Sequence, residues 1–203
     1  MTPPIEIRRR VFAMQELRVA TNGEKRTLHG YAAVYDQLSD DLGGFNEMIR
    51  RGAFDESMGK DDIRCLWNHD ANVVFGRNLA GTLRLMSDAR GLKIECDMPD
   101  TQTARDVGVS IQRGDVSQMS FGFRTLEQRW TFRRPPELDF RELMKCQLFD
   151  VSPVTFAAYP QTEVGVRSMA SEVETWKAAR AAHDAEIAAA ESRRRRLRLA
   201  EAS

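Results

Sequence analysis

The feature that most restricts the fold of this chain is a regular alternation of apolar and polar side chains over residues 83–98. Apolar residues occupy every second position on either side of a Ser-Asp-Ala-Arg-Gly segment, at Leu83, Leu85, Leu92, Ile94, Cys96 and Met98. Successive side chains of a strand point to opposite faces, so this spacing predicts two strands that bury one face, with the polar segment as their turn. A β-hairpin is therefore the clearest local prediction.

The rest of the region between residues 27 and 168 also carries strand signals. Four further segments have strand-like composition or alternation: LHGYAAVYD, DIRCLWNHD, SQMSFGFRTL and MKCQLFDVSPVTF. One helix is expected to begin with an Asp cap at Asp100 and to end at Gly114, and another short helix is expected within residues 45–58. Several short strands with isolated helices predict a mainly β protein with helices (α+β), built as an antiparallel barrel or sandwich.

Composition divides the chain into three regions. Residues 1–26 form a charged N-terminal segment, residues 27–168 form the expected domain, and residues 169–203 are rich in Ala, Glu and Arg without Gly or Pro. The last region predicts a C-terminal helical tail, because its residues are strong helix formers. A lone helix gains little stability by itself, so we expect the tail either to dock through Trp176, its one large aromatic residue, or to fray.

The tail ends in a basic cluster formed by Arg193, Arg194, Arg195, Arg196 and Arg198. The simplest interpretation is that these residues form a solvated helix end, where their positive charges complement the helix dipole. A second interpretation, which we favour slightly, is a helix that binds a partner protein and places the chain within an assembly. Binding to DNA is a weaker third interpretation.

Charge and composition exclude several classes of protein. Lys and Arg together number 30 and so do Asp and Glu, and this balance argues against a protein that coats nucleic acid. No stretch approaches the ~18 apolar residues of a membrane span, and the N-terminus lacks the apolar core of a signal peptide, so we expect a cytoplasmic protein. Cys65, Cys96 and Cys146 are too few and too widely spaced for a disulfide framework or a zinc site, and we expect buried thiols.

Among the three histidines, His69 has the position best suited to catalysis. It closely follows an alternating row that ends at Trp67, so a rigid strand would hold it beside a cleft. His29, at the start of a strand, is expected to pack or to lie at the surface. His183 lies in the tail and is expected to be solvated.

Ser120 and Asp150 are the other candidates. In Met-Ser-Phe-Gly-Phe the apolar side chains share one face of a strand, which puts Ser120 and Gly122 on the other face, and the absent side chain of Gly122 would let a substrate backbone approach the hydroxyl. Asp150 continues an apolar row that ends at Leu148, where a carboxylate needs a partner such as an imidazole. Taken singly, each is equally consistent with an ordinary strand residue.

Together, His69, Ser120 and Asp150 make up the parts needed for nucleophilic acyl transfer. A serine hydroxyl is a weak nucleophile until a base takes its proton, and a third group must orient that base and stabilise its charged form. The three residues are far apart in the sequence, so the hypothesis requires the fold to bring them together.

The order of these segments resembles that of the prohead (capsid-maturation) serine proteases of tailed phages. The resemblance spans roughly residues 28–168 and is carried by seven segments in order: LHGYAAVYD, IRRGAFDESM, LWNHDANVVFGR, GTLRL, GLKIECDMPDT, RGDVSQMSFGF and LFDVSPVTFAAYPQTEV. The His-Asp segment, the Ser-Phe-Gly-Phe segment and the Val-Ser-Pro-Val segment are together quite specific to that family.

The resemblance implies a role for each candidate. His69 matches the catalytic histidine, Ser120 matches the nucleophile, and Asp150 stands at the third position, where many relatives have Glu. Similarity of the family to the herpesvirus maturation proteases implies an antiparallel β-barrel surrounded by short helices. The backbone amides near Phe121 and Gly122 are candidate oxyanion donors, and no metal or organic cofactor is implied.

The resemblance also implies a biological role. It predicts a serine endopeptidase that cleaves phage scaffold and major capsid protein precursors, that also cleaves itself, and that works within the assembling prohead in the host cytoplasm. Self-association is a further expectation, whereas membrane and nucleic-acid partners are not expected.

Other functions remain open at this point. The chain could be a non-catalytic capsid-assembly or scaffolding protein that uses the same domain as a binding module. It could also be a cysteine hydrolase that uses Cys65 or Cys146 with His69. A metal hydrolase is the poorest alternative, because one suitably placed histidine and no HExxH-type helix are present.

Overall fold

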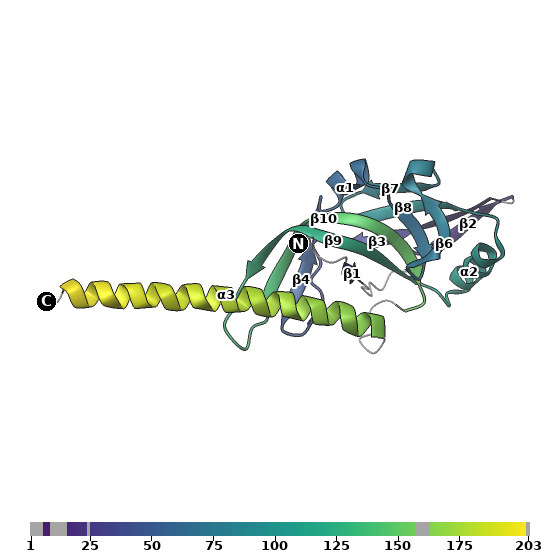
Figure 1. Cartoon of the computed structure of the whole chain (residues 1–203). Helices are drawn as coiled ribbons and strands as arrows, with labels where there is room; N and C mark the ends of the chain where they lie inside the picture. The colour runs from purple at the N-terminus through teal and green to yellow at the C-terminus, as the bar shows by residue number, and fades with distance from the viewer. Residues whose placement is uncertain (1–5, 9–15, 24, 157–162, 202–203) are drawn as a thin grey trace.

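The computed structural model describes the backbone of residues 6–8, 16–23, 25–156 and 163–201, and the side chains of residues 16–23, 25–156 and 173–198. Its strands form two open sheets, and a long C-terminal helix extends away from them (Figure 1). Residues 157–162, which belong to the last family-like segment, lie outside the described residues. The helices within the described residues are not long and apolar enough to cross a membrane.

The smaller sheet contains the hairpin predicted from sequence alternation. It has the order β2-β3-β8-β7, and all its neighbours are antiparallel. Its strands are β2 (Arg18–Asn22), β3 (Lys25–Val34), β7 (Leu83–Ser87) and β8 (Gly91–Met98). Leu83 pairs with Cys96 and Leu85 with Ile94, so the alternating apolar residues share one face as predicted.

The larger sheet is built around two long strands, β9 (Gln118–Thr131) and β10 (Asp139–Val154), which form an antiparallel pair. Its order is β1-β9-β10-β5-β6, and β4 also pairs with β10. The remaining strands are β1 (Glu6–Arg8), β4 (Phe45–Ile49), β5 (Arg64–Trp67) and β6 (Asp70–Arg77). Both β4 and β5 run parallel to β10, so this sheet is mixed.

One core lies between the two sheets. Leu28 and Ile94 of the small sheet are fully buried in the same apolar cluster as Phe121, Phe123 and Leu148 of the large sheet. The mainly β class with helices is therefore confirmed. The expected closed antiparallel barrel is not confirmed, because the described strands form two open sheets and one of them is mixed. Alternation identifies strands in a sequence, but it does not say which strands pair or in which direction.

The short helices differ in detail from their predictions. The helix α2 (Gln102–Arg113) is capped by Thr101, whose hydroxyl accepts the Ala104 N–H at 3.3 Å, rather than by an aspartate; it ends at Gly114, where φ is 84°. The prediction of a helix within residues 45–58 is correct only for the end of that range. The first part of that range is strand β4, and α1 (Asp55–Lys60) begins near its end. A 3-10 turn, η1 (Asn78–Ala80), follows β6.

The predicted tail is a helix, α3 (Glu163–Glu201), and it docks through the expected residue. Trp176 packs against Phe45 of β4 with ring centroids 6.2 Å apart, and its indole Nε1 donates to Asp139 at 2.7 Å. His183, expected to be solvated, instead stacks on Phe132 at 4.6 Å. Beyond this contact the helix projects away from the sheets (Figure 1).

Candidate active site

The paired strands β9 and β10 bring two of the candidates onto one face of the sheet. Ser120 of β9 lies directly opposite Ser152 of β10, and Gly122 lies opposite Asp150. Directly opposite residues of an antiparallel pair point their side chains to the same face. The face with Ser120 and Asp150 is opposite to the one on which Phe121 enters the core.

A β-bulge in β10 turns Asp150 toward this face. Leu148 pairs with Phe123 and Asp150 pairs with Gly122, which leaves Phe149 as an extra residue. Leu148 and Val151 both point into the core, although strict alternation would put them on opposite faces. Asp150 therefore does not continue the apolar row of Leu148 as predicted, because the bulge moves its carboxylate to the other face of the sheet.

Gly122 has a different role from the predicted one. A Cβ atom at this position would lie 2.3 Å from Oδ2 of Asp150, closer than atoms can approach. The space that glycine leaves free is thus filled by the carboxylate of Asp150, and not by a substrate backbone.

His69 reaches the same face from the turn that joins β5 to β6. Asn68 and His69 are the two residues of this turn, with φ values of 51° and 61°, as in the type I′ turns of tight hairpins. Asn68 fastens the turn to the end of β10: its backbone N–H donates to Pro153 O at 3.1 Å, and its side-chain oxygen accepts the Thr155 N–H at 2.9 Å. The turn thus holds His69 beside the strand that carries Asp150.

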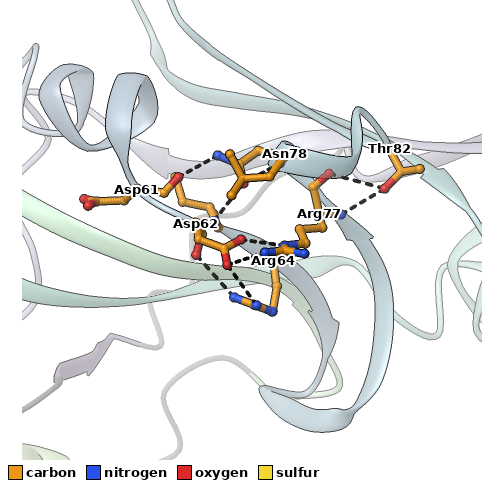
Figure 2. Close-up of polar contacts among 8 residues, drawn as sticks. Asp61, Asp62, Arg64, Arg77, Asn78 and Thr82 are labelled. Atoms are coloured by element: carbon orange, nitrogen blue, oxygen red, sulfur yellow. Dashed lines mark hydrogen bonds and ion pairs between the residues drawn. The ribbon is translucent and has the colours of Figure 1, made fainter.

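A network of polar contacts secures the other end of the β5–β6 hairpin (Figure 2). Arg64 and Arg77 lie directly opposite each other, and Asp62 binds both guanidinium groups, accepting two hydrogen bonds of 2.7 Å from Arg77 and one of 3.0 Å from Arg64. Asn78 accepts the Ile63 N–H at 2.8 Å. Both ends of the hairpin are therefore tied down, which restricts the position of His69.

The three predicted site residues meet in one hydrogen-bonded series. His69 Nε2 lies 2.7 Å from Ser120 Oγ, and His69 Nδ1 lies 2.6 Å from Asp150 Oδ1. An ionised carboxylate only accepts, so Nδ1 carries the proton and donates, which leaves Nε2 free to accept from the serine hydroxyl. The Ser120 residue is fully buried, and the side chains of His69 and Asp150 are 6% and 12% exposed.

The sequence patterns did not identify two residues that belong to this site, Ser152 and Asn68. Ser152 donates from Oγ to Asp150 Oδ1 at 2.6 Å, so the carboxylate oxygen that faces His69 has a second donor. Its position two residues after Asp150 in a strand was the available signal, because residues i and i+2 share a face. Asn68 was the other omission, and the preference of asparagine for positive φ in tight turns could have indicated it.

The thiols do not suit a nucleophilic role. Cys65, Cys96 and Cys146 are free and buried, as predicted. A hydrogen bond with Cys96, together with burial, raises the pKa of the Cys65 thiol well above its usual value, which disfavours the reactive thiolate. No cluster of three or more metal-ligating side chains occurs within the residues that the structure describes.

In serine hydrolases, a hydroxyl, an imidazole and a carboxylate are hydrogen-bonded in this order. This site has the same arrangement, and here a two-sheet β fold carries it. Residues 13–177 match the family of caudovirus prohead serine proteases, and the chain belongs to that family. It is accordingly a serine protease.

Two further comparisons were made. The solved structure of the capsid assembly protease of bacteriophage T4 is similar to this chain with a TM-score of 0.41 and 8% sequence identity, over 75% of this chain and 96% of the phage T4 chain. A search of curated protein sequences found no significant match.

Proposed function

We propose that this chain is the endopeptidase that cleaves scaffold segments and capsid protein precursors while a phage prohead matures, within the assembling shell in the host cytoplasm. The observation that carries the proposal is the continuous series Ser120–His69–Asp150 in a member of the prohead protease family. We also propose that the same activity cleaves the chain itself.

In the proposed mechanism, Ser120 is the nucleophile and His69 is the base. Nε2 of His69 takes the hydroxyl proton as Oγ attacks the peptide carbonyl, and it later gives a proton to the leaving amine; water then hydrolyses the acyl-enzyme. Asp150 holds the imidazole in the required tautomer and stabilises the imidazolium that forms. Backbone N–H groups near Phe121 and Gly122 would stabilise the oxyanion.

We also propose that residues 27–168 form most of the protease domain, to which strand β2 of the N-terminal segment is added, and that the tail is a separate element that binds the scaffold or capsid precursor. The shape of α3 supports this assignment, since its N-terminal half docks on the domain and its arginine-rich half projects beyond it (Figure 1). Self-association of the chain remains part of the same proposal.

The test is to replace Ser120 by alanine. Purified unmodified chain should react with a fluorophosphonate and should cleave scaffold or capsid precursor, and Ser120→Ala should abolish labelling and reduce cleavage by roughly 10³-fold or more. Ser110→Ala is the matched control, because this serine lies on α2 and bonds to its own helix through the Asp106 carbonyl.

Equal fragment patterns from the unmodified chain and from Ser120→Ala would overturn the proposal and favour a non-catalytic assembly protein. Cleavage that persists in Ser120→Ala but is abolished by a thiol-alkylating reagent would favour a cysteine hydrolase.

A further inference from the structure

The edge of β9 that faces away from β10 runs past Ser120, and β1 occupies it. The strand order places β1 on that side, paired antiparallel to β9. The pairs are Glu6 with Phe123, Ile7 with Gly122 and Arg8 with Phe121. The last paired residue of β9 is Phe121, so the pairing stops one position short of Ser120. Figure 1 shows β1 between β9 and α3, and β1 contacts α3 as well.

A sheet edge of this kind is a binding site for extended peptide. It presents a row of backbone N–H and C=O groups that accept another strand with little regard to its sequence. A strand added here in the register of β1 and longer by one residue would have a residue directly opposite Ser120. Such a strand would present a peptide bond to the nucleophile in a defined orientation, as cleavage requires.

The contact made by β1 is small compared with the rest of the sheet. It pairs with β9 at three positions, whereas β10 pairs with β9 at thirteen. Residues 6–8 also lie outside the part of the chain, residues 13–177, that matches the protease family. Another extended segment could therefore replace β1 without disturbing the strands that carry the site.

We infer that the Phe121–Phe123 edge of β9 binds substrate as an added antiparallel strand, and that β1 occupies this edge as a built-in competitor. The inference rests on the proposed function for the identity of the reacting residues. It assigns the substrate class as extended, locally unfolded peptide, and it makes the resting chain self-inhibited until β1 is displaced.

The first experiment measures binding and requires no cleavage. A fluorescein-labelled peptide with the sequence of residues 1–12 is titrated into full-length Ser120→Ala chains that also carry Ile7→Pro and Arg8→Pro. Proline cannot donate a backbone hydrogen bond, so the proline chain should release the edge and bind the peptide at least about tenfold more tightly than the Ser120→Ala chain. Ile7→Ala/Arg8→Ala is the matched control, since it keeps both backbone donors.

Single substitutions give a second reading if the double variant does not fold. Backbone N–H groups of successive strand residues point to opposite sides, so one of Ile7→Pro and Arg8→Pro removes a bond to β9 and the other does not. The two single variants should therefore bind the peptide with different Kd values. Equal Kd values in all folded variants, or no binding to any of them, would overturn the inference.

Activity separates this inference from the proposed function. With Ser120 intact, the proline variant should cleave a peptide substrate with a several-fold lower KM and an unchanged kcat. If the edge opens to the labelled peptide but no variant cleaves any substrate, the proposed function fails and the binding edge stands. If cleavage occurs with the same KM in every variant, the edge inference fails and the protease stands.

Discussion

The two ends of the β9–β10 pair both hold buried carboxylates, but they give them different partners. At the site end, Asp150 faces the imidazole of His69 and the hydroxyl of Ser152. At the other end, Glu142 accepts from Arg129 at 2.5 Å and from Arg50 at 2.8 Å. On the same pair of strands, Asp150 thus faces an imidazole, which can change its charge, whereas Glu142 faces two guanidinium groups, which cannot.

The difference separates chemistry from structure. A guanidinium stays protonated at all ordinary pH values, so its carboxylate partner forms a permanent ion pair. An imidazole gains and loses a proton near neutrality, so a carboxylate beside it can stabilise a transient positive charge. A buried carboxylate by itself therefore does not indicate a candidate active site. The chemical type of the group that it binds does.

The charged end of the strands also receives the tail. Asp139 accepts from Trp176 and, at 2.8 Å, from Arg180 of α3, while Arg141 and Glu47 form a fully buried pair at 3.1 Å beside them. The helix is therefore fastened to the end of the sheet with fixed charges, away from the end that carries Ser120.

The difference between the two carboxylates should show most strongly in Asp150→Asn. The amide keeps the shape of the side chain but removes the charge that, in the proposed mechanism, orients and stabilises His69, so kcat/KM should fall by about 10²–10⁴-fold. Thermal unfolding should change little by comparison. The matched variant is Glu142→Gln, for which kcat/KM of the folded protein should stay within a factor of two or so. If the two variants lose activity equally, the distinction between the two ends is wrong.

A smaller effect is expected from Gly122→Ala. The added Cβ would lie 2.3 Å from Asp150 Oδ2, so the carboxylate must rotate away from His69, and a displacement of this size costs about 10²-fold in kcat. Gly59→Ala in α1 is the control, because nothing lies within 4 Å of a Cβ there. Steady-state kinetics on both variants measures the difference, and full activity of Gly122→Ala would show that Asp150 need not stay in place.

The smallest effect concerns stability at acidic pH. Hydrogen bonds from Arg129 and then from Arg50 lower the pKa of Glu142 from 4.5 to about 2. A carboxylate whose pKa is lower in the folded state stabilises the fold fully above its unfolded pKa, and this contribution is lost as pH falls through the folded value. Glu142 should therefore contribute about 3 kcal/mol at neutral pH, declining between pH 4.5 and about 2.

Chemical denaturation at a series of pH values measures this contribution. The unmodified chain should lose stability more steeply than Glu142→Gln between pH 4.5 and about 2, and the two curves should run in parallel above pH 5. Parallel curves across the whole acidic range would show that the ion pairs of Glu142 add nothing to the fold.

Local structure could be predicted from the order of the residues alone. Period-two alternation identified the β7–β8 hairpin, helix-forming composition identified α3, and Trp176 was the anchor that its isolation suggested. These features depend on neighbours in the chain, so local patterning is sufficient to predict them. The family-like segments likewise named His69, Ser120 and Asp150 without any coordinates.

The way in which those three residues meet depends on long-range pairing in the folded chain. The bulge at Phe149 reverses the face of Asp150, the positive φ of His69 aims its ring from a turn, and Gly122 leaves room for a carboxylate that lies 28 positions later. Each depends on pairing between segments distant in the chain. A shift of one residue in such a pairing moves a side chain to the other face of the sheet. The register of the pairing cannot be predicted from local composition.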